Sequence, residues 1–219
     1  MGPWEQIDAR VRARVRDAAA TWWDEATAGP FERERFLAAF SGAGRRLGRE
    51  CVAEPLRGPA AEGLGVQARP WAELGRIGLL LSMAARVPEP QHLAIVDETY
   101  RTGDLSEKQA VLRALCVLPH PARLLGVAAE GARANAMAVV EAITCDNPYP
   151  ARFFPADAFN QLVMKALFNA LPLGGIVGLS TRLDADLIRM ARDYGRERRA
   201  AGRPISADLA WLEGETAAS

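Results

Sequence analysis

The sequence has little of the residues on which most metal sites and hydrolytic centres depend. It has two histidines, His92 and His120, and three cysteines that form no C-x-x-C pair. Cys116 and His120 are four residues apart, but Pro119 interrupts the helix that would align them. Neither histidine accompanies a recognisable nucleophile. We therefore expect no metal site, no cofactor and no Ser-His-Asp type of hydrolase.

The chain also lacks net charge, because 27 basic side chains balance 27 acidic ones. Without an excess of positive charge there is no broad attraction for a polyanion, so we expect no nucleic-acid partner. Only Lys108 and Lys165 among the basic residues are lysines. Arginine is thus the usual cation of this chain, and a lysine either marks a position that needs a compact ammonium or survives by chance.

Long apolar runs are missing as well, and we expect no leader segment, because the N-terminus is charged from Glu5 onward. The most apolar stretch, residues 77–85, lies between two arginines and is far shorter than the ~20 residues that span a bilayer. The odd number of cysteines suggests no disulfide framework. We therefore expect a cytoplasmic protein that does not span a membrane.

Helix is the one period that the sequence contains. Apolar residues recur at spacings of three and four, while β-branched residues are few and scattered. Residues 4–28 read as one helix with Trp4, Ile7, Val11 and Trp22 on its apolar stripe. Short helices of similar size follow. The pattern predicts an all-α fold without significant sheet, either a helical bundle or stacked antiparallel helical hairpins of the HEAT or armadillo kind.

We expect one all-α domain over residues 1–219, with four parts. Residues 1–56 form N-terminal helices, and the Gly- and Pro-containing segment 57–69 forms a loop. Residues 70–144 form a scaffold of helical hairpins, in which Asp104 and Glu107 have the spacing of a capping box. Residues 145–212 are dense in polar and aromatic residues that a packed helix does not need.

The C-terminal part holds the candidate ligand-binding residues. Asn147 and Tyr149 belong to an Asn-Pro-Tyr-Pro bend that two prolines stiffen. Asn160 and Lys165 lie on the next helix, Asn160 near the core boundary and Lys165 on a polar stripe. Arg198 falls on the apolar line of the last long helix, so its guanidinium requires a carboxylate, carbonyl groups or an anionic ligand.

Each of these residues also has a structural interpretation. The polar stripe with Lys165 is typical of a solvated helix face, and Arg198 could simply bind the backbone of the 145–155 bend. Asp193, Tyr194 and Glu197 stand beside Arg198 and are expected to act as structural anchors. The residues alone therefore predict a location but no reaction.

Several sequence blocks in this part resemble the EboA family. They are Asn147-Pro148-Tyr149-Pro150, Phe159-Asn160-Gln161, Lys165-Ala166-Leu167-Phe168, Pro172-Leu173, Gly178-Leu179, Arg189-Met190, Asp193-Tyr194 and Glu197-Arg198-Arg199-Ala200-Ala201-Gly202-Arg203. The family commonly has His before the Asn-Pro pair, where this chain has Asp146.

The resemblance implies a bacterial accessory protein that takes part in moving a secondary metabolite, next to a TatD-like hydrolase and a prenyltransferase-like membrane protein. It implies no reaction, and no catalytic residue is assigned. Our leading interpretation is a protein that binds a small metabolite, or a partner carrying one, through Asn147, Tyr149, Asn160, Lys165 and Arg198. One alternative is a metal-independent enzyme for a small carbonyl or anionic metabolite that uses Lys165 and Tyr149. Another is a structural adaptor for pathway proteins.

Overall fold

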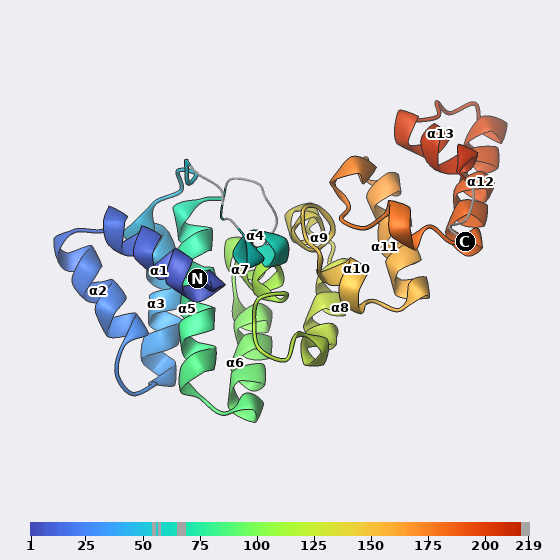
Figure 1. The fold of residues 1–219 in the computed structure, drawn as a ribbon. Coiled ribbons are helices and arrows are strands. Elements are labelled where there is room, and N and C mark those ends of the chain that lie inside the picture. The colour runs from blue at the N-terminus through green and yellow to red at the C-terminus, as the bar shows by residue number, and fades with distance from the viewer. Residues whose placement is uncertain (54–55, 57, 65–68, 216–219) are drawn as a thin grey trace.

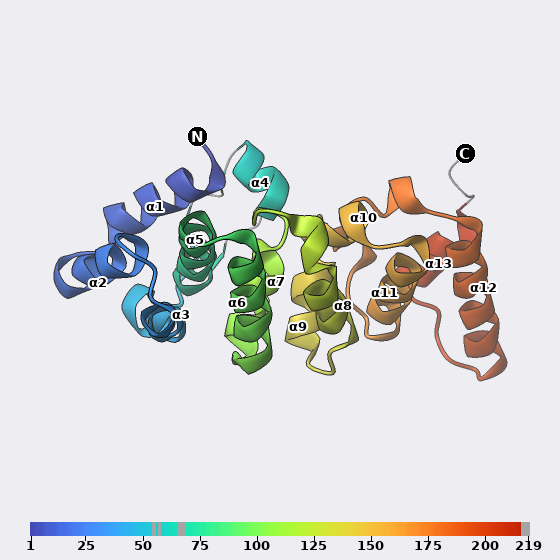
Figure 2. The same cartoon turned by 90° about the horizontal axis from the view of Figure 1, so that it is seen from below.

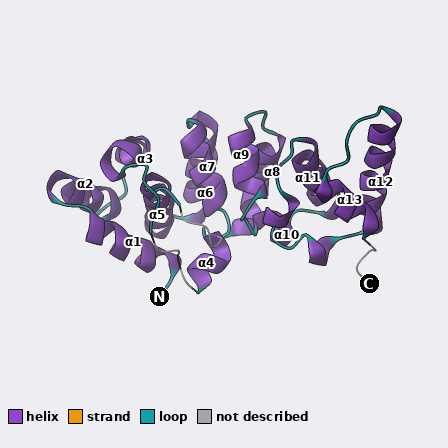
Figure 3. Ribbon diagram, turned by 90° about the horizontal axis from the view of Figure 1, so that it is seen from above, coloured by secondary structure: helices purple, strands orange, loops and turns teal. Residues whose placement is uncertain are grey.

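The structure, a computed structural model, describes residues 1–53, 56, 58–64 and 69–215, with side chains omitted for residues 59–61. Within this part of the chain the regular structure is helical, and Figure 3 shows helices joined by loops. The prediction of an all-α fold is confirmed. In chain order the α-helices are α1 (Pro3–Arg14), α2 (Asp17–Thr27), α3 (Arg33–Leu47), α4 (Pro59–Leu64), α5 (Trp71–Arg86), α6 (Glu89–Thr102), α7 (Leu105–Ala114), α8 (Leu125–Arg133), α9 (Met137–Thr144), α10 (Tyr149–Phe153), α11 (Ala156–Phe168), α12 (Ala185–Ala200) and α13 (Ala207–Gly214).

The helices lie side by side in a row. Helices α3, α5, α7 and α9 contact one another in succession, and α6 and α8 pack against α7. Figures 1 and 2 show this row from two directions, with α1 to α3 at one end and α12 and α13 at the other. The row is compatible with stacked hairpins, but a repeating HEAT or armadillo unit stays a prediction.

Helix α5 provides the centre of the N-terminal core. Ile77, Leu79, Leu80 and Met83 have no exposed surface, because α3 and α7 flank the helix and α1 packs across it. Burial of such side chains is the main stabilising contribution to folding. This arrangement also sets α3, α5 and α7 next to each other, which determines the groove described below.

The prediction of one helix over residues 4–28 is wrong. Val15 and Arg16 have extended backbone conformations that separate α1 from α2. The break lets Trp23 of α2 fold back into the core beside Ile7 of α1, fully buried. Gly78 of α5 makes room for both, since a Cβ there would lie 2.8 Å from Ile7 Cγ2 and 2.9 Å from Trp23 Cη2.

The segment 57–69 is not a continuous loop. Helix α4 occupies Pro59–Leu64 and contacts α1 and α7. Residues 57 and 65–68 of the expected loop lie outside the described residues. The capping box at the start of α7 is confirmed, because Glu107 N–H donates to Asp104 Oδ1 at 2.8 Å and Asp104 N–H donates to Glu107 Oε2 at 2.9 Å.

Candidate functional site

Asn147 ties three elements together. Its side-chain amide donates to Leu112 O of α7 at 3.1 Å and to Ala142 O of α9 at 2.8 Å, and its Oδ1 accepts from Tyr149 N–H at 3.0 Å. The residue is 2% exposed. The expected rigid turn of residues 147–155 contains a helix, since α10 begins at Tyr149. The amide of Asn147 therefore closes the bend rather than facing solvent.

Tyr149 is fully buried beneath this bend. Its hydroxyl donates to Pro121 O at 2.7 Å, and its ring packs against Phe153 with the ring centres 4.8 Å apart. Burial raises the pKa of Tyr149 well above its ordinary value, and the neighbouring Cys116 acts in the same direction. A proton on this hydroxyl is consequently hard to remove, which suits a structural role.

Asn160 connects α11 with α12. Its Nδ2 donates to both carboxylate oxygens of Asp184 at 2.9 Å, and Asp184 in turn caps α12 by accepting from Leu187 N–H at 2.7 Å. Burial raises the pKa of Asp184, but the hydrogen bonds from Leu187 and Asn160 outweigh it, so the pKa is lowered overall. Oδ1 of Asn160 is buried and has no hydrogen-bond partner within the described part of the chain.

Lys165 binds the C-terminal end of α8. Its Nζ donates to Ala132 O and to Ala134 O, both at 2.8 Å. The last carbonyls of a helix lack partners within the helix and carry partial negative charge, so an ammonium there is stabilising. Burial lowers the pKa of Lys165. The side chain also lines a groove of about 410 Å³ between α8 and α11, whose other polar members are Arg133 and Gln161.

Arg198 does not bind the backbone of the 145–155 bend, and the expectation of that contact is corrected here. Its Nε donates to Pro204 O at 2.7 Å and its Nη1 donates to Tyr194 Oη at 3.0 Å, both within the C-terminal segment. Helix α11 separates α12 from α10 along the row (Figures 1 and 2). The guanidinium thus binds the loop that follows α12 and a tyrosine of α12 itself, and no hydrogen bond among the described residues engages its Nη2.

The expected anchors beside Arg198 differ in their contacts. Tyr194 packs edge-on against Phe168 of α11 with ring centres 4.6 Å apart, which fixes α12 on α11. Asp193 pairs with Arg196 on the exposed face, and Glu197 is exposed. The side-chain polar atoms of Asn147, Tyr149 and Lys165 are thus bonded to other groups of the protein, and Lys165 also lines a groove. Whether any of these residues binds a ligand stays a prediction.

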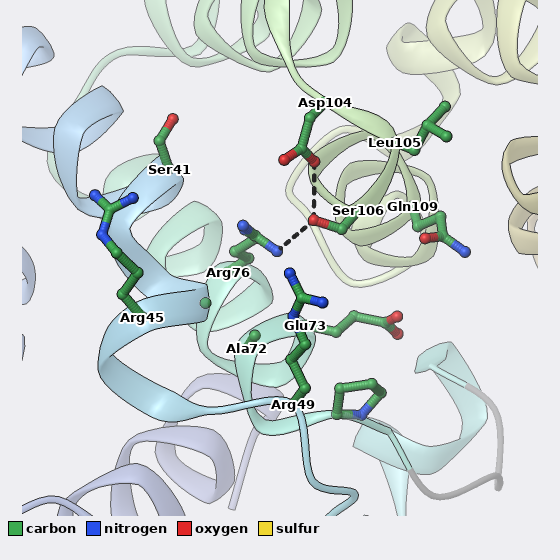
Figure 4. Close-up of a pocket in the computed structure, with 12 residues that line it drawn as sticks. Ser41, Arg45, Arg49, Ala72, Glu73, Arg76, Asp104, Leu105, Ser106 and Gln109 are labelled. Atoms are coloured by element: carbon green, nitrogen blue, oxygen red, sulfur yellow. Dashed lines mark hydrogen bonds between the residues drawn. The ribbon is translucent and has the colours of Figure 1, made fainter.

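A different groove, which the sequence did not indicate, lies between α3, α5 and α7. Its volume is about 790 Å³. We call it the arginine groove, because three arginines line it. The lining residues are Ser41, Gly44, Arg45, Arg49, Pro70, Ala72, Glu73, Arg76, Asp104, Leu105, Ser106 and Gln109 (Figure 4). A volume of this order is typical of pockets for small molecules.

Arg76 forms the floor of the arginine groove and is only 4% exposed. Its Nε donates to Phe40 O at 3.0 Å and its Nη1 donates to Ser106 Oγ at 3.1 Å. Its Nη2 lies 3.9 Å from Glu107 Oε1, which makes an ion pair but no hydrogen bond. Burial lowers the pKa of Arg76, and Glu107 opposes this effect. One amino group of a buried guanidinium therefore retains donor capacity at the groove.

Arg45 and Arg49 are exposed along the same groove. Within the part of the chain that the structure describes, neither side chain has a hydrogen bond or an ion pair. Figure 4 shows the guanidinium groups of Arg49 and Arg76 directed into the same space below Ser106. The charge of Arg49 also acts to lower the pKa of Arg76, as expected for two neighbouring cations.

Helix α7 forms the opposite wall and presents acceptors. Oδ1 of Asp104 accepts from Ser106 Oγ and from Glu107 N–H, both at 2.8 Å. Nε2 of Gln109 donates to Ala138 O at 3.2 Å. The Ser106 backbone N–H also acts to lower the pKa of the Asp104 carboxyl, but no hydrogen bond of regular geometry among the described residues engages Asp104 Oδ2 or Gln109 Oε1. Both oxygens are available to a bound molecule.

Glu73, which lines the groove as well, belongs to a buried ion network. Its Oε1 accepts from Arg69 Nη1 at 2.9 Å and lies 3.4 Å from Arg113 Nε. Arg69 Nη2 lies 3.4 Å from Asp146 Oδ2, just before the Asn147 bend. The carboxylate of Glu73 is therefore paired mainly with Arg69 and Arg113, and its charge also acts to raise the pKa of Arg76.

Only Arg76 has a sequence context that is compatible with this site. Arg76 stands on α5 among apolar residues, where a guanidinium needs compensation. Arg45 and Arg49 are four residues apart, and no sequence pattern distinguishes them from the many other arginines of this chain. Their approach to α7 is a tertiary feature.

Two kinds of feature are absent from the described part of the chain. No group of three or more His, Cys, Asp or Glu side chains in this part of the chain is placed to hold a metal ion. Among its helices, none combines the length and the apolar character that crossing a bilayer requires.

Comparisons with known proteins assign the chain to a family. Neither the curated proteins nor the solved structures provide a match. A family model described as metabolite traffic protein EboA matches residues 4–213, nearly the whole chain. The protein therefore belongs to the EboA family, whose description points to metabolite traffic.

Proposed function

We propose that this protein binds a small anionic metabolite in the arginine groove and passes it on without changing it chemically. In this proposal it works in the bacterial cytoplasm as an accessory protein of secondary metabolism. Its partners are then pathway proteins, of which the family resemblance suggests a TatD-like hydrolase and a prenyltransferase-like membrane protein. The family description supports metabolite handling, while the site and the ligand charge are our inference.

One observation carries the proposal: cationic groups converge on one groove with donor capacity left over. Arg45 and Arg49 lack protein partners among the described residues, and Arg76 is held rigidly beneath them by Phe40 O and Ser106. A fixed guanidinium loses little conformational entropy when it binds an oxyanion, and its planar fork matches a carboxylate or phosphate. The groove is thus prepared for an anion.

The enzymatic alternative fits the contacts less well. It needs Lys165 as a base or Schiff-base amine and Tyr149 as an acid, but the Tyr149 hydroxyl is buried and bonded to Pro121 O. The lowered pKa of Lys165 is the feature that favours this alternative. Trapping with borohydride and a carbonyl substrate would support it, and the absence of trapping would argue against the Schiff-base form.

The residues of the C-terminal part then have a supporting role in our proposal. Helices α9 to α12 are held in place by Asn147, Tyr149, Asn160 and Arg198. Lys165 caps α8, and the small groove that it lines could bind a second ligand or part of the first. This revises their expected role as one common binding site.

Native mass spectrometry tests the proposal. The protein is purified from a host that carries the neighbouring genes, as wild type, as the double variant Arg45→Gln/Arg49→Gln, and as Arg46→Gln. Arg46 is the matched control, since it lies on α3 next to Arg45 but outside the groove lining. We expect a bound small mass in the wild type and in Arg46→Gln, and its loss in the double variant.

Equal retention of that mass by the double variant would refute binding at this groove. The adaptor alternative makes a separate prediction. If the protein only holds pathway partners together, pull-down of those partners survives the double substitution and no small mass accompanies any of the three proteins.

A further inference from the structure

The two walls of the arginine groove present opposite hydrogen-bonding chemistry. Arg45 of α3, Arg49, which follows α3, and Arg76 of α5 offer donors only, because a guanidinium has no acceptor. Asp104 and Gln109, at α7, offer the unbonded oxygens Oδ2 and Oε1. Figure 4 shows the Asp104 carboxylate and the Arg76 guanidinium facing the same space from opposite sides.

An anion without hydrogen-bond donors would fit only one of these walls. Its charge would bind the arginines, but the Asp104 carboxylate would repel it and Gln109 Oε1 would lose water without gaining a partner. A hydroxyl group on the same molecule removes this conflict, because it donates to a carboxylate or an amide oxygen. The acceptor wall therefore selects for donors on the ligand.

A cationic group on the ligand would satisfy Asp104 less well than a hydroxyl does. Three guanidinium groups line the groove, of which Arg76 is paired with Glu107, while Arg45 and Arg49 have no ion pair with a described residue. The second lining carboxylate, Glu73, is already paired with Arg69 and Arg113. An ammonium would face this excess of positive charge. Neutral donors suit the groove better.

Building on the proposed function, we infer that the ligand is a hydroxylated oxyanion. Its carboxylate or phosphate binds Arg49 and Arg76, with Arg45 contributing from the rim, and its hydroxyl groups donate to Asp104 Oδ2 and Gln109 Oε1. Asp104 is then the residue that determines specificity, while the arginines provide affinity.

Matched pairs of probes test this inference by isothermal titration near neutral pH and at fixed ionic strength. Gluconate and hexanoate have the same carbon-chain length and one carboxylate, but only gluconate carries hydroxyl groups along its chain. Glycerol 3-phosphate and propyl phosphate make the same comparison for a phosphate. We expect the hydroxylated member of at least one pair to bind about tenfold more tightly, as one or two well-placed hydrogen bonds to charged or amide oxygens provide.

The variant Asp104→Asn isolates the acceptor wall. Asparagine caps helices as well as aspartate does, so α7 keeps its N-cap while the carboxylate is lost. We expect the preference for the hydroxylated probe to fall to about threefold or less, while the unhydroxylated probe binds equally or slightly more tightly because repulsion is removed. Asp97→Asn on α6 is the control, since it removes an exposed carboxylate outside the groove and should keep the full preference.

The outcomes separate this inference from the proposed function. If wild type binds both members of each pair equally and Arg45→Gln/Arg49→Gln binds neither, the groove takes anions but the inference about hydroxyl groups is wrong. A full preference in Asp104→Asn would also overturn it. If the double variant binds all four probes as wild type does, or if no probe binds to wild type, both the inference and this site for the proposed function fail.

Discussion

At the residue scale, single polar side chains of the C-terminal part close helix ends and bends. Lys165, Asn147 and Arg198 each donate to backbone carbonyls that have no partner in regular structure. The sequence did indicate that these residues matter, because each is polar near an apolar surface. It could not indicate which carbonyls they reach, since those carbonyls come from other segments of the chain.

Replacement of Lys165 by methionine should destabilise the protein by about 1–2 kcal/mol, because the terminal carbonyls of α8 lose two charge-assisted hydrogen bonds at a half-buried place. Urea unfolding followed by circular dichroism measures the change. Lys108→Met is the control, since the Lys108 ammonium lies 5.5 Å from the Tyr100 ring centre and no hydrogen bond within the described residues is lost with it. Equal effects of both substitutions would contradict the capping role.

Asp184 should make the stability depend on pH in the acid range. Its pKa is lower in the folded state than its ordinary value, so the unfolded state binds the proton more strongly. The stabilisation is present above the ordinary carboxyl pKa and is lost as pH falls through the lowered folded value. Urea midpoints measured from neutral to acid pH should therefore fall less steeply in Asp184→Asn than in wild type. An unchanged slope would rule out this contribution.

At the scale of elements, the sequence predicted helix starts better than helix breaks. Asp104 and Glu107 carry a local signal, and the structure confirms it. The break between α1 and α2 has no Gly or Pro. It appears only as a shift in the helical phase of the buried positions, because Trp23 is buried, whereas a continuous helix would bury Trp22. A period read across the break therefore gave the wrong face.

Substitution of Asp104 should separate capping from ligand selection. Asp104→Ala should lower the free energy of unfolding by about 1 kcal/mol, because Glu107 N–H loses its acceptor, whereas Asp104→Asn should stay within about 0.5 kcal/mol of wild type. Denaturant unfolding of the two variants measures both values. Comparable losses in both would mean that the charge, not the cap, stabilises α7.

Asn147→Ala should destabilise the protein by about 2–4 kcal/mol, since it leaves Leu112 O, Ala142 O and Tyr149 N–H without a partner in a buried bend. Denaturant unfolding again gives the value. Asn169→Ala is the matched control, because that amide makes one exposed hydrogen bond to Lys165 O. A loss below about 1 kcal/mol for Asn147→Ala would show that the bend holds without this amide.

At the scale of the whole molecule, the helices form a row in which successive neighbours make the main contacts. The all-α class could be predicted from local periodicity, but the arginine groove could not. Arg49, Arg76 and Asp104 are far apart in the sequence, and only the packing of α3, α5 and α7 unites them. A single sequence without the tertiary arrangement gave no reason to group these three among so many arginines and acids.

Hydrogen exchange should reflect this arrangement. Backbone amides of α5 lie between α3 and α7, so they should exchange more slowly than those of α13, whose main contact is α12. Exchange followed by mass spectrometry of proteolytic peptides measures the difference. Uniform protection along the chain would indicate one cooperative unit instead of a gradient.

The position of the arginine groove within the row has a consequence for proteolysis and local unfolding of this protein. Proteolysis or local unfolding of α12 and α13 affects one end of the row, because these two helices make most of their contacts with each other. This end is far from the helices that surround Arg76. A molecule that has lost these two helices should therefore still bind anions in the arginine groove, because α3, α5 and α7 remain packed on one another.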